Sequence, residues 1–203
     1  MHDQPPLDTT TAPDDPSELF AHWYRAALDT VSDEPTAVAL ATVGADGRPA
    51  ARMVLLKGFD EAGYVFYTNF ASRKGAELDA NPHAALLFWW PPLLRQVRIE
   101  GLVTRVDATE ADAYFATRPR GSQIGAWASP QSEPLTDRSE LEARVAAESA
   151  RHGEHEVPRP PFWGGYRLAP DAFEFWQGRP DRLHDRVHYR HADGVWHRVR
   201  LAP

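Results

Sequence analysis

The chain has 203 residues, of which 42% are hydrophobic and 25% are charged, with a formal net charge of −7 at pH 7. This is the composition of an ordinary globular protein, and the net negative charge argues against a nucleic-acid-binding protein, which needs a broad basic surface. The absence of cysteine excludes disulfides, thiolate nucleophiles and cysteine-ligated metal sites and fits a reducing cytoplasm, and no apolar run approaches the roughly 20 residues that span a bilayer.

The N-terminal residues 1–14, MHDQPPLDTTTAPD, are mainly short polar, Pro and Thr residues with little to bury. They predict a flexible leader before a single domain of residues 15–203. A helix is expected to follow at once, because Asp15 is placed as its N-cap, Pro16 suits the first turn and Glu18 completes a capping-box-like pattern. Its buried stripe at helical spacing consists of Leu19, Phe20, Trp23, Ala27 and Val31.

From residue 36 onward the pattern changes to short β-rich runs that are separated by Gly/Asp turns, which is typical of antiparallel hairpins. The expected strands cover residues 37–44, 49–59, 64–70, 83–90, 95–106, 166–169, 172–178, 186–191 and 195–203. Helices are expected at residues 72–81, with Ser72 as N-cap, and at residues 109–117, 122–127 and 137–152. The pattern predicts a β-barrel with helices packed around it, and no G-x-G-x-x-G motif supports a Rossmann domain.

Arg52 and Lys57 lie at either end of the apolar run in RMVLLKGF. Strand side chains alternate between faces, so the two cations are expected on opposite sides. They are either strand-end residues in water or contributors to an anion site.

Arg73 and Lys74 lie in the first turn of the helix that Ser72 begins. Cations there oppose the helix dipole, which favours anions at an N-terminus. A bound phosphate would remove the conflict, since backbone N–H groups, dipole and both cations would then converge on it. A solvated helix start remains the alternative.

Tyr114, Arg118 and Ser122 are each four residues apart in YFATRPRGSQIGAW. A continuous helix would align them on one face, although Pro119 interrupts it. A phenol, a guanidinium and a hydroxyl together suit a second anion site; a solvated helix end is the alternative.

The stretch FWQGRPDRLHDRVHYRH, residues 175–191, is the most cationic part of this acidic chain. A metal site made by His184, His188 and His191 is disfavoured, because several Arg residues lie among them and no carboxylate stands at H-E-x-x-H spacing. A serine hydrolase is disfavoured as well, since the chain has no G-x-S-x-G elbow. Two anion sites with aromatic side chains suggest two phosphorylated small molecules bound face to face.

From about Asp15 to Pro203 the chain resembles the pyridoxine/pyridoxamine 5′-phosphate oxidase family. The resemblance is carried by seven stretches in this order: RMVLLK, FYTNFASRKG, RQVRIEG, RPRGSQIGAWAS, FWGGYR, EFWQGRPDRLHDR and the terminal RLAP. The resemblance implies an FMN-binding antiparallel split β-barrel with surrounding helices, a mainly β fold with α elements. It also implies a cytoplasmic homodimer whose FMN sites are shared between the two chains.

By this resemblance, each predicted site residue receives a role. FMN would be held by Arg52, Met53, Val54, Leu55, Tyr67, Thr68, Arg73, Lys74, Gln96, Gln131, Ser132, Trp176 and Arg186. The substrate phosphate would be met by Lys57, Tyr114, Arg118 and Ser122, and the catalytic residues Arg182 and His184, with Leu183 between them, would contact the pyridine ring.

The implied reaction is hydride transfer from the substrate's C4′ carbon to the flavin, with O₂ as final acceptor and H₂O₂ as by-product. Pyridoxine 5′-phosphate would give pyridoxal 5′-phosphate directly, whereas pyridoxamine 5′-phosphate would give an imine that water hydrolyses to pyridoxal 5′-phosphate and ammonia. The alternatives are a related flavin oxidase of the phenazine-biosynthesis type and a flavin-binding protein without turnover. Lys57 with the Tyr114, Arg118 and Ser122 set favours a phosphorylated substrate.

One feature departs from the family pattern. Family members often carry an Arg- and Tyr-bearing segment before the first helix that closes over the substrate, whereas Met1–Asp14 contains no Arg, Lys or Tyr. The sequence therefore predicts that removal of residues 1–14 barely alters kcat/KM.

Overall fold

Every strand pairing in the computed structural model, which describes residues 5–203, is antiparallel. Within that range nine strands form one sheet in the order β2-β1-β5-β6-β7-β4-β3, with β8 added to β7 and β9 added to β8. The elements are α1 (Pro16–Thr30), β1 (Ala37–Val43), β2 (Pro49–Leu55), β3 (Gly58–Asp60), β4 (Gly63–Asn69), α2 (Arg73–Ala80), β5 (His83–Trp90), η1 (Pro91–Leu93), β6 (Arg95–Arg105), α3 (Ala108–Ala116), α4 (Arg120–Ala128), α5 (Arg138–His152), β7 (Trp163–Gln177), η2 (Pro180–Arg182), β8 (Asp185–Ala192) and β9 (Val195–Arg200). The expected antiparallel barrel with helices around it is confirmed.

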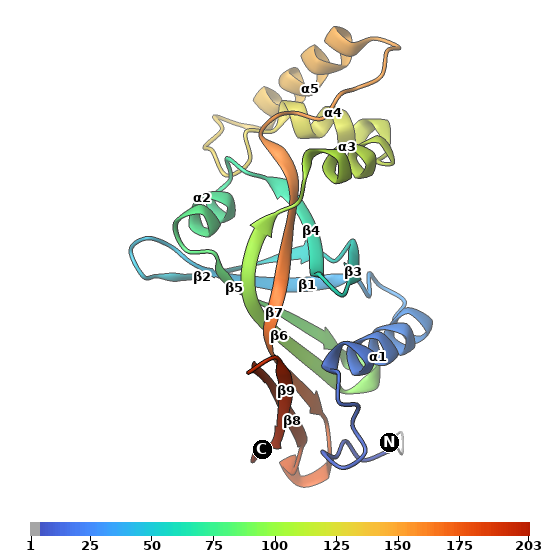
Figure 1. Ribbon diagram of the computed structural model, residues 1–203. Helices are drawn as coiled ribbons and strands as arrows, with labels where there is room; N and C mark the ends of the chain where they lie inside the picture. Colours follow the sequence, from blue (N-terminus) through green and yellow to red (C-terminus); the bar gives the residue numbers. More distant parts are fainter. Residues whose placement is uncertain (1–4) are drawn as a thin grey trace.

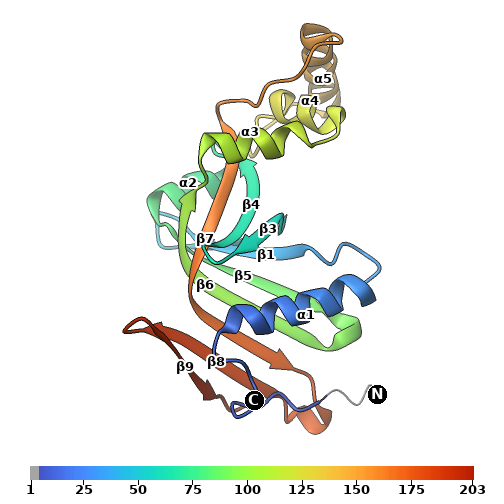
Figure 2. The same ribbon diagram turned by 45° about the vertical axis from the view of Figure 1, so that its right-hand side comes forward.

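One end of the molecule is helical and the other end is a β-hairpin (Figures 1 and 2). Helices α3, α4 and α5 gather at one end, and the β8–β9 hairpin lies at the other. Strand β7 runs between the two ends, because its first half pairs with β4 and its second half with β8. Residues that are close in sequence around β7 can therefore belong to opposite ends of the protein.

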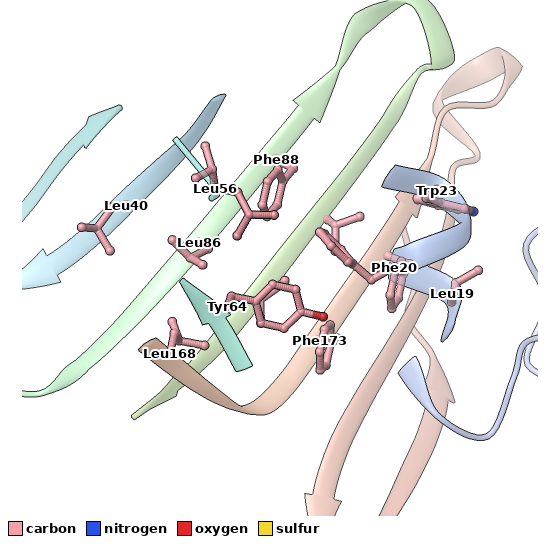
Figure 3. Packing of buried hydrophobic residues seen from close by; sticks show 14 of the residues in the cluster. Leu19, Phe20, Trp23, Leu40, Leu56, Tyr64, Leu86, Phe88, Leu168 and Phe173 are labelled. Atoms are coloured by element: carbon pink, nitrogen blue, oxygen red, sulfur yellow. The ribbon is translucent and has the colours of Figure 1, made fainter. Parts of the chain in front are cut away.

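Helix α1 covers the inner face of the curled sheet and closes the core. Asp15 caps it as expected, since its side chain accepts a hydrogen bond from the Ser17 N–H at 2.8 Å. Phe20 is fully buried and meets Tyr64 edge-on, with 4.9 Å between the ring centroids (Figure 3). Trp23 meets Phe175 edge-on, with 5.3 Å between the ring centroids. These aromatic contacts fix the helix on the sheet by burial and ring geometry together.

Strand β5 illustrates how alternation builds the sheet. Leu86, Phe88 and Trp90 are buried, whereas Leu87 and Trp89 between them are exposed on the opposite face. Alternate side chains of a strand point to opposite faces, so one face of β5 enters the core. The other face presents apolar side chains to the surface.

Strand β7 corrects one expectation, because residues 166–169 and 172–178 are parts of a single 15-residue strand. Pro170 signals a break in the sequence. The strand continues past it through a β-bulge, because Glu100 pairs with Ala172 and the next residue, Gly101, pairs with Pro170, which leaves Asp171 of β7 without a partner in β6. A Cβ atom on Gly101 would lie 2.0 Å from the Ala169 carbonyl oxygen, so the close approach of the two backbones requires glycine there.

The expected strand at residues 49–59 is divided into β2 and β3. The break comes at Leu56 and Lys57, where the Leu56 N–H donates to the Thr36 carbonyl and the Lys57 N–H donates to the Val65 carbonyl. The backbone therefore leaves β1 as partner and joins β4. This turn places Lys57 at the rim of the cavity described below.

Residues 5–14 do not behave as a segment with little to bury, and that expectation is wrong for Leu7, which is 7% exposed and belongs to the main core cluster. Tyr189 donates to the Pro13 carbonyl at 2.9 Å, and Arg198 donates to the Thr9 carbonyl at 2.7 Å. The segment is thus fastened along the β8–β9 hairpin. The first four residues of the predicted leader lie outside the described range.

None of the helices between residues 5 and 203 is long and apolar enough to cross a membrane.

Candidate active site

A cavity of about 680 Å³ opens at the helical end of the sheet, between β2, β4, α2, α3 and α4. The predicted site residues that line it are Met53, Val54, Leu55, Lys57, Tyr67, Thr68, Lys74, Tyr114, Arg118, Ser122 and Gln131. The structure therefore brings residues predicted for the cofactor and residues predicted for the substrate phosphate into one space. Its volume is in the range of pockets that hold small organic ligands, roughly 300–1,000 Å³.

One wall of the cavity is a stack of three aromatic rings. The Tyr67 ring lies parallel to that of Tyr114 at 3.9 Å and to that of Trp163 at 5.5 Å. Gly165 permits this arrangement, since a Cβ atom there would lie 2.8 Å from Cε1 of Tyr67. Burial raises the pKa of Tyr67 to about 12, so its phenol stays protonated and can donate a hydrogen bond at neutral pH.

Arg118, at the second wall, forms no ion pair with an acidic side chain of residues 5–203. Its guanidinium carbon lies 4.6 Å from the centroid of the Trp163 ring, and its Nη1 atom is buried with no hydrogen-bond partner among residues 5–203. Burial lowers the pKa of Arg118 below its usual value. A buried, unpartnered guanidinium nitrogen in a cavity is costly unless an anion binds it, so these residues fit a phosphorylated ligand.

Tyr114 and Ser122 line the same cavity as Arg118, although not on one continuous helix. Tyr114 belongs to α3 and Ser122 to α4, and Pro119 is the N-cap residue between the two. The expected convergence nevertheless occurs, because both side chains and Arg118 line the cavity. Lys57, which is exposed, lines the cavity from the β2–β3 connection.

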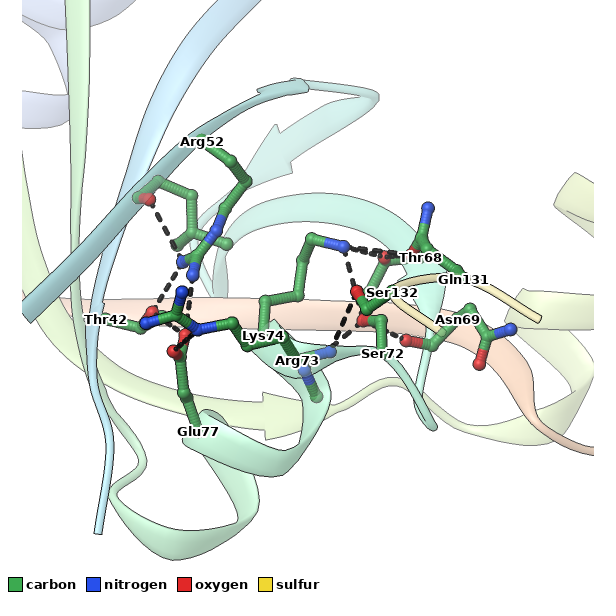
Figure 4. A network of polar contacts seen from close by, with 12 residues as sticks. Thr42, Arg52, Thr68, Asn69, Ser72, Arg73, Lys74, Glu77, Gln131 and Ser132 are labelled. Atoms are coloured by element: carbon green, nitrogen blue, oxygen red, sulfur yellow. Dashed lines mark hydrogen bonds and ion pairs between the residues drawn. The ribbon is translucent and has the colours of Figure 1, made fainter. Parts of the chain in front are cut away.

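A second cationic site lies at the N-terminus of α2 (Figure 4). Ser72 is its N-cap, as expected, and the Lys74 ammonium donates to Thr68 Oγ1 at 3.0 Å and to Gln131 Oε1 at 2.9 Å. Burial, together with the nearby charge of Arg52, lowers the pKa of Lys74 to about 8. An anion at this position would stabilise the charged ammonium, so the site also fits a phosphate group.

Behind Lys74, Glu77 gathers two of the predicted cofactor residues. Its carboxylate accepts hydrogen bonds from Thr42 Oγ1 at 2.6 Å, from Arg73 Nε at 2.8 Å and from Arg52 Nη2 (Figure 4). Burial raises the pKa of Glu77, but these hydrogen bonds outweigh burial and hold it below the usual value. Three cations therefore face one carboxylate around α2, leaving an excess of positive charge beside the cavity.

Arg52, Arg73 and Ser132 do not line the cavity itself. The Arg52 side chain points to Glu77, and that of Arg73 is 67% exposed. Ser132, in the left-handed region with φ of 77°, accepts a hydrogen bond from the Arg73 N–H at 3.1 Å. These residues support the N-terminus of α2 and do not contact the cavity directly.

The remaining predicted site residues do not line this cavity in a single chain: Gln96, Trp176, Arg182, Leu183, His184 and Arg186. They lie at the hairpin end, where Gln96 pairs with Trp176 across β6 and β7 and the Trp176 ring lies 4.4 Å from that of His184. Arg186 is held by Glu174. Arg182 ends η2 and is exposed, as is Leu183, whereas His184 is half-buried. In this loop, which includes η2, Asp181 and Arg182 both have positive φ.

Sequence reasoning missed several residues of the site. Trp163 is the most important, since it packs against both Tyr67 and Arg118; Asn69, Thr117, Pro119, Gly125, Ala126 and Ser129 also line the cavity. The FWGG sequence was a signal for Trp163, because two glycines after a tryptophan allow close packing on its strand.

Comparison with family models assigns most of the chain. Residues 24–152 match the model described as pyridoxamine 5′-phosphate oxidase. Residues 163–203 match the model described as the pyridoxine 5′-phosphate oxidase C-terminal dimerisation region. The second match covers all the predicted residues of the 179–186 region.

Individual proteins agree with these models. The pyridoxine/pyridoxamine 5′-phosphate oxidase of Rubrobacter xylanophilus is 58% identical over 93% of this chain and 87% of its own length. That of Thermosynechococcus vestitus is 59% identical over 95% of this chain and 90% of its own length. Among solved structures, PhzG from Burkholderia lata, in complex with tetrahydrophenazine-1-carboxylic acid, has a TM-score of 0.91 at 33% identity over 99% of this chain and 98% of its own. A pyridoxamine 5′-phosphate oxidase-related, FMN-binding protein of Nostoc punctiforme, at 20% identity and a TM-score of 0.72 over 95% and 98% of the two chains, shares the fold.

Proposed function

The chain belongs to the pyridoxamine 5′-phosphate oxidase family, and we propose that its cavity is the place where it oxidises pyridoxine 5′-phosphate or pyridoxamine 5′-phosphate to pyridoxal 5′-phosphate with FMN as cofactor. The observation that carries this proposal is the presence of two separate anion sites on one cavity. Lys74 marks the first and Arg118 the second, and the rings of Tyr67 and Tyr114 line the space. A phosphorylated flavin and a phosphorylated pyridine need this arrangement.

FMN would be held by the α2 side of the cavity. The Met53–Leu55 strand, Thr68, Lys74 and Gln131 are in position to contact it, and Glu77 keeps Arg52 and Arg73 beside them. When bound, FMN supplies the electron acceptor for the oxidation, and O₂ takes the electrons onward as H₂O₂.

The chain's own contribution to the reaction is binding and orientation. Arg118 supplies a guanidinium donor for the substrate phosphate, supported by the hydroxyls of Tyr114 and Ser122 and by the Lys57 ammonium. Binding energy from this remote phosphate holds the reacting carbon in place, which is the usual use of a non-reacting substrate group.

We further propose that the site is completed by a second copy of the chain. Five predicted site residues lie at the hairpin end (Figure 1), away from the cavity of their own chain: Gln96, Trp176, Arg182, His184 and Arg186. Residues 163–203, which include four of them, match a dimerisation region. In a homodimer, the hairpin end of one protomer would close the cavity of the other. The partner's Arg182 and the partner's His184 would then contact the pyridine ring.

A phenazine-biosynthesis type oxidase is the second candidate, since PhzG shares the fold closely. The proteins named pyridoxine/pyridoxamine 5′-phosphate oxidase are, however, 56–59% identical to this chain, against 33% for PhzG. The unpartnered Arg118 nitrogen also suits a phosphate oxygen. A flavin-binding protein without turnover would not need the second anion site. A cytoplasmic location stays a prediction.

The test is a visible spectrum of the purified protein followed by anaerobic addition of pyridoxine 5′-phosphate. We expect a flavin spectrum that bleaches on addition and returns with air, with formation of pyridoxal 5′-phosphate and H₂O₂. Bleaching by tetrahydrophenazine-1-carboxylic acid, the compound bound to PhzG, but not by the pyridine phosphates would support the second candidate. A flavin spectrum that neither kind of substrate bleaches would support the third alternative, a flavin-binding protein without turnover.

A further inference from the structure

Asp185 joins three parts of the chain at the base of the loop that carries Arg182 and His184. It is the first residue of β8 and is 8% exposed. Its carboxylate accepts hydrogen bonds from Arg179 Nε at 2.6 Å, from the Leu7 backbone N–H at 3.2 Å and from Arg200 Nη1 at 3.3 Å. One buried carboxylate thus binds the start of the loop, the N-terminal segment and the last strand.

The loop needs such a support, because its backbone conformation is unfavourable. Asp181 and Arg182 have φ of 56° and 61°, the left-handed region that non-glycine residues rarely adopt. Leu183 is 69% exposed, so the tip of the loop gains little from burial. Within the loop, the Arg179 N–H donates to His184 Nδ1 at 3.1 Å, which ties the imidazole to the residue that Asp185 holds.

The N-terminal segment completes the same cluster. Arg179 Nη2 donates to the Pro5 carbonyl at 2.7 Å, and Arg200 Nη2 donates to the Leu7 carbonyl and to Asp8, both at 3.1 Å. Leu7 itself is buried in the core cluster. Residues 5–8 therefore cover Asp185 and share its two arginine partners.

We propose that Asp185 is a positioning residue that, by holding Arg179 and the backbone of Leu7 together, fixes the loop that presents Arg182 and His184 to the substrate. The N-terminal segment is then part of the support of the substrate site from behind, although it carries none of the residues expected of a lid. Contrary to the expectation from the sequence, removal of residues 1–14 should then lower kcat/KM. This inference rests on the proposed function for the role of the loop, whereas the coupling of the two segments does not depend on it.

The test compares Asp185→Asn with Asp14→Asn as a matched control. Asp14 also belongs to the N-terminal segment, but it pairs with Arg198 of β9 and not with a residue of the loop. Hydrogen–deuterium exchange is measured in the FMN-loaded protein, together with kcat/KM for pyridoxine 5′-phosphate and the dissociation constant of FMN from titration of the apoprotein.

For Asp185→Asn we expect faster exchange at the Leu7 and Asp8 amides, the two amide-bearing residues of 5–8, and in residues 179–184. We also expect a loss of roughly 10- to 100-fold in kcat/KM, the usual effect of removing a residue that orients a site. The FMN dissociation constant should change little, since Arg186 keeps its own partner Glu174. Asp185→Glu, which keeps the carboxylate, should recover part of the loss, and Asp14→Asn should behave as the unchanged protein.

Faster exchange in only one of the two segments would overturn the coupling, and unchanged kcat/KM with faster exchange in both would overturn the role in positioning. If Asp185→Asn does not fold, removal of residues 1–8 replaces it: exchange in residues 179–184 must then rise, and unchanged exchange there would also overturn the proposal. Should the unaltered protein oxidise neither pyridine phosphate, the proposed function fails while the exchange measurement still decides whether Asp185 couples the segments.

Discussion

Arg118 lies over the indole ring of Trp163, 4.6 Å from the ring centroid, with its Nη1 atom buried and unpartnered among residues 5–203. The ring contact holds the side chain in place without using its hydrogen-bond donors. The donors are therefore available to a ligand, and the desolvation cost has already been met in the folded protein.

Replacement of Arg118 by Met should raise KM for pyridoxine 5′-phosphate roughly tenfold to over a hundredfold, because a hydrogen bond to a charged group contributes about 1.5–3 kcal/mol. FMN should remain bound, since Arg118 is on the substrate side of the cavity. Steady-state kinetics and the flavin spectrum measure the two effects. Arg144→Met, which removes a surface cation paired with Glu140, is the control. An unchanged KM would remove Arg118 from the substrate site.

Lys57→Met should raise the same KM by a smaller factor, about tenfold or less, because Lys57 is exposed and its charge is screened by water. FMN should stay bound in this variant as well. To assign the effect to the phosphate, the affinities of wild type and Lys57→Met for pyridoxal 5′-phosphate and for unphosphorylated pyridoxal are compared, with binding followed by ligand absorbance. Equal weakening for both ligands would show that Lys57 does not contact the phosphate.

FMN affinity should depend on pH through Lys74. Burial and the charge of Arg52 lower the pKa of Lys74 to about 8, so the ligand-free protein loses this positive charge as pH rises through 8. Affinity of the apoprotein for FMN should therefore fall between pH 7 and pH 9.5, as followed by quenching of flavin fluorescence. Lys74→Arg stays charged over this range and should show a flatter profile. A wild-type profile that is flat would contradict the assignment.

Arg73→Ala should weaken FMN binding and give a purified protein with reduced or no yellow colour. Arg73 is the first residue of α2 and pairs with Glu77 four residues later. Arg138, the first residue of α5, pairs with Glu142 at the same spacing, but both side chains are exposed, whereas Glu77 is buried, so Arg138→Ala is a matched control. Full FMN occupancy in Arg73→Ala would exclude Arg73 from the cofactor site.

Much of the fold could be predicted because its signals are local. Asp15 and Ser72 cap α1 and α2 as their sequence neighbourhoods indicated. The continuity of β7 could not be predicted, since Pro170 reads as a break and only the β-bulge at Asp171 accommodates it. The packing of Leu7 depends on β8 and β9, almost two hundred residues away in the sequence, and nothing in residues 1–14 announces it.

The site residues that could be predicted from the sequence are the charged ones and those that belong to family motifs. Lys74, in the first turn of α2, opposes the helix dipole unless an anion is bound, and that conflict is visible in the sequence. Lys57 and Arg118 were predicted from residue type and family resemblance, and the burial of the Arg118 Nη1 atom appears only in the structure. Glu77 was missed because it looks like the partner of Arg73 in a surface helix pair. Its burial comes from Arg52 and Thr42 on neighbouring strands, which sequence periodicity does not reveal.

The central claim is that each active site combines the cavity of one protomer with the loop of the other, and mixed dimers test it most directly. Arg118→Met and an Arg182→Met, His184→Ala double variant are unfolded together and refolded as a mixture with FMN. Activity is measured at a pyridoxine 5′-phosphate concentration well below the wild-type KM, where each variant alone has little activity. If sites are shared, half of the dimers contain one wholly intact site, and the mixture should recover about one quarter of the wild-type activity. If each protomer builds its own site, no dimer contains an intact one, and a mixture as inactive as its two components would contradict the account.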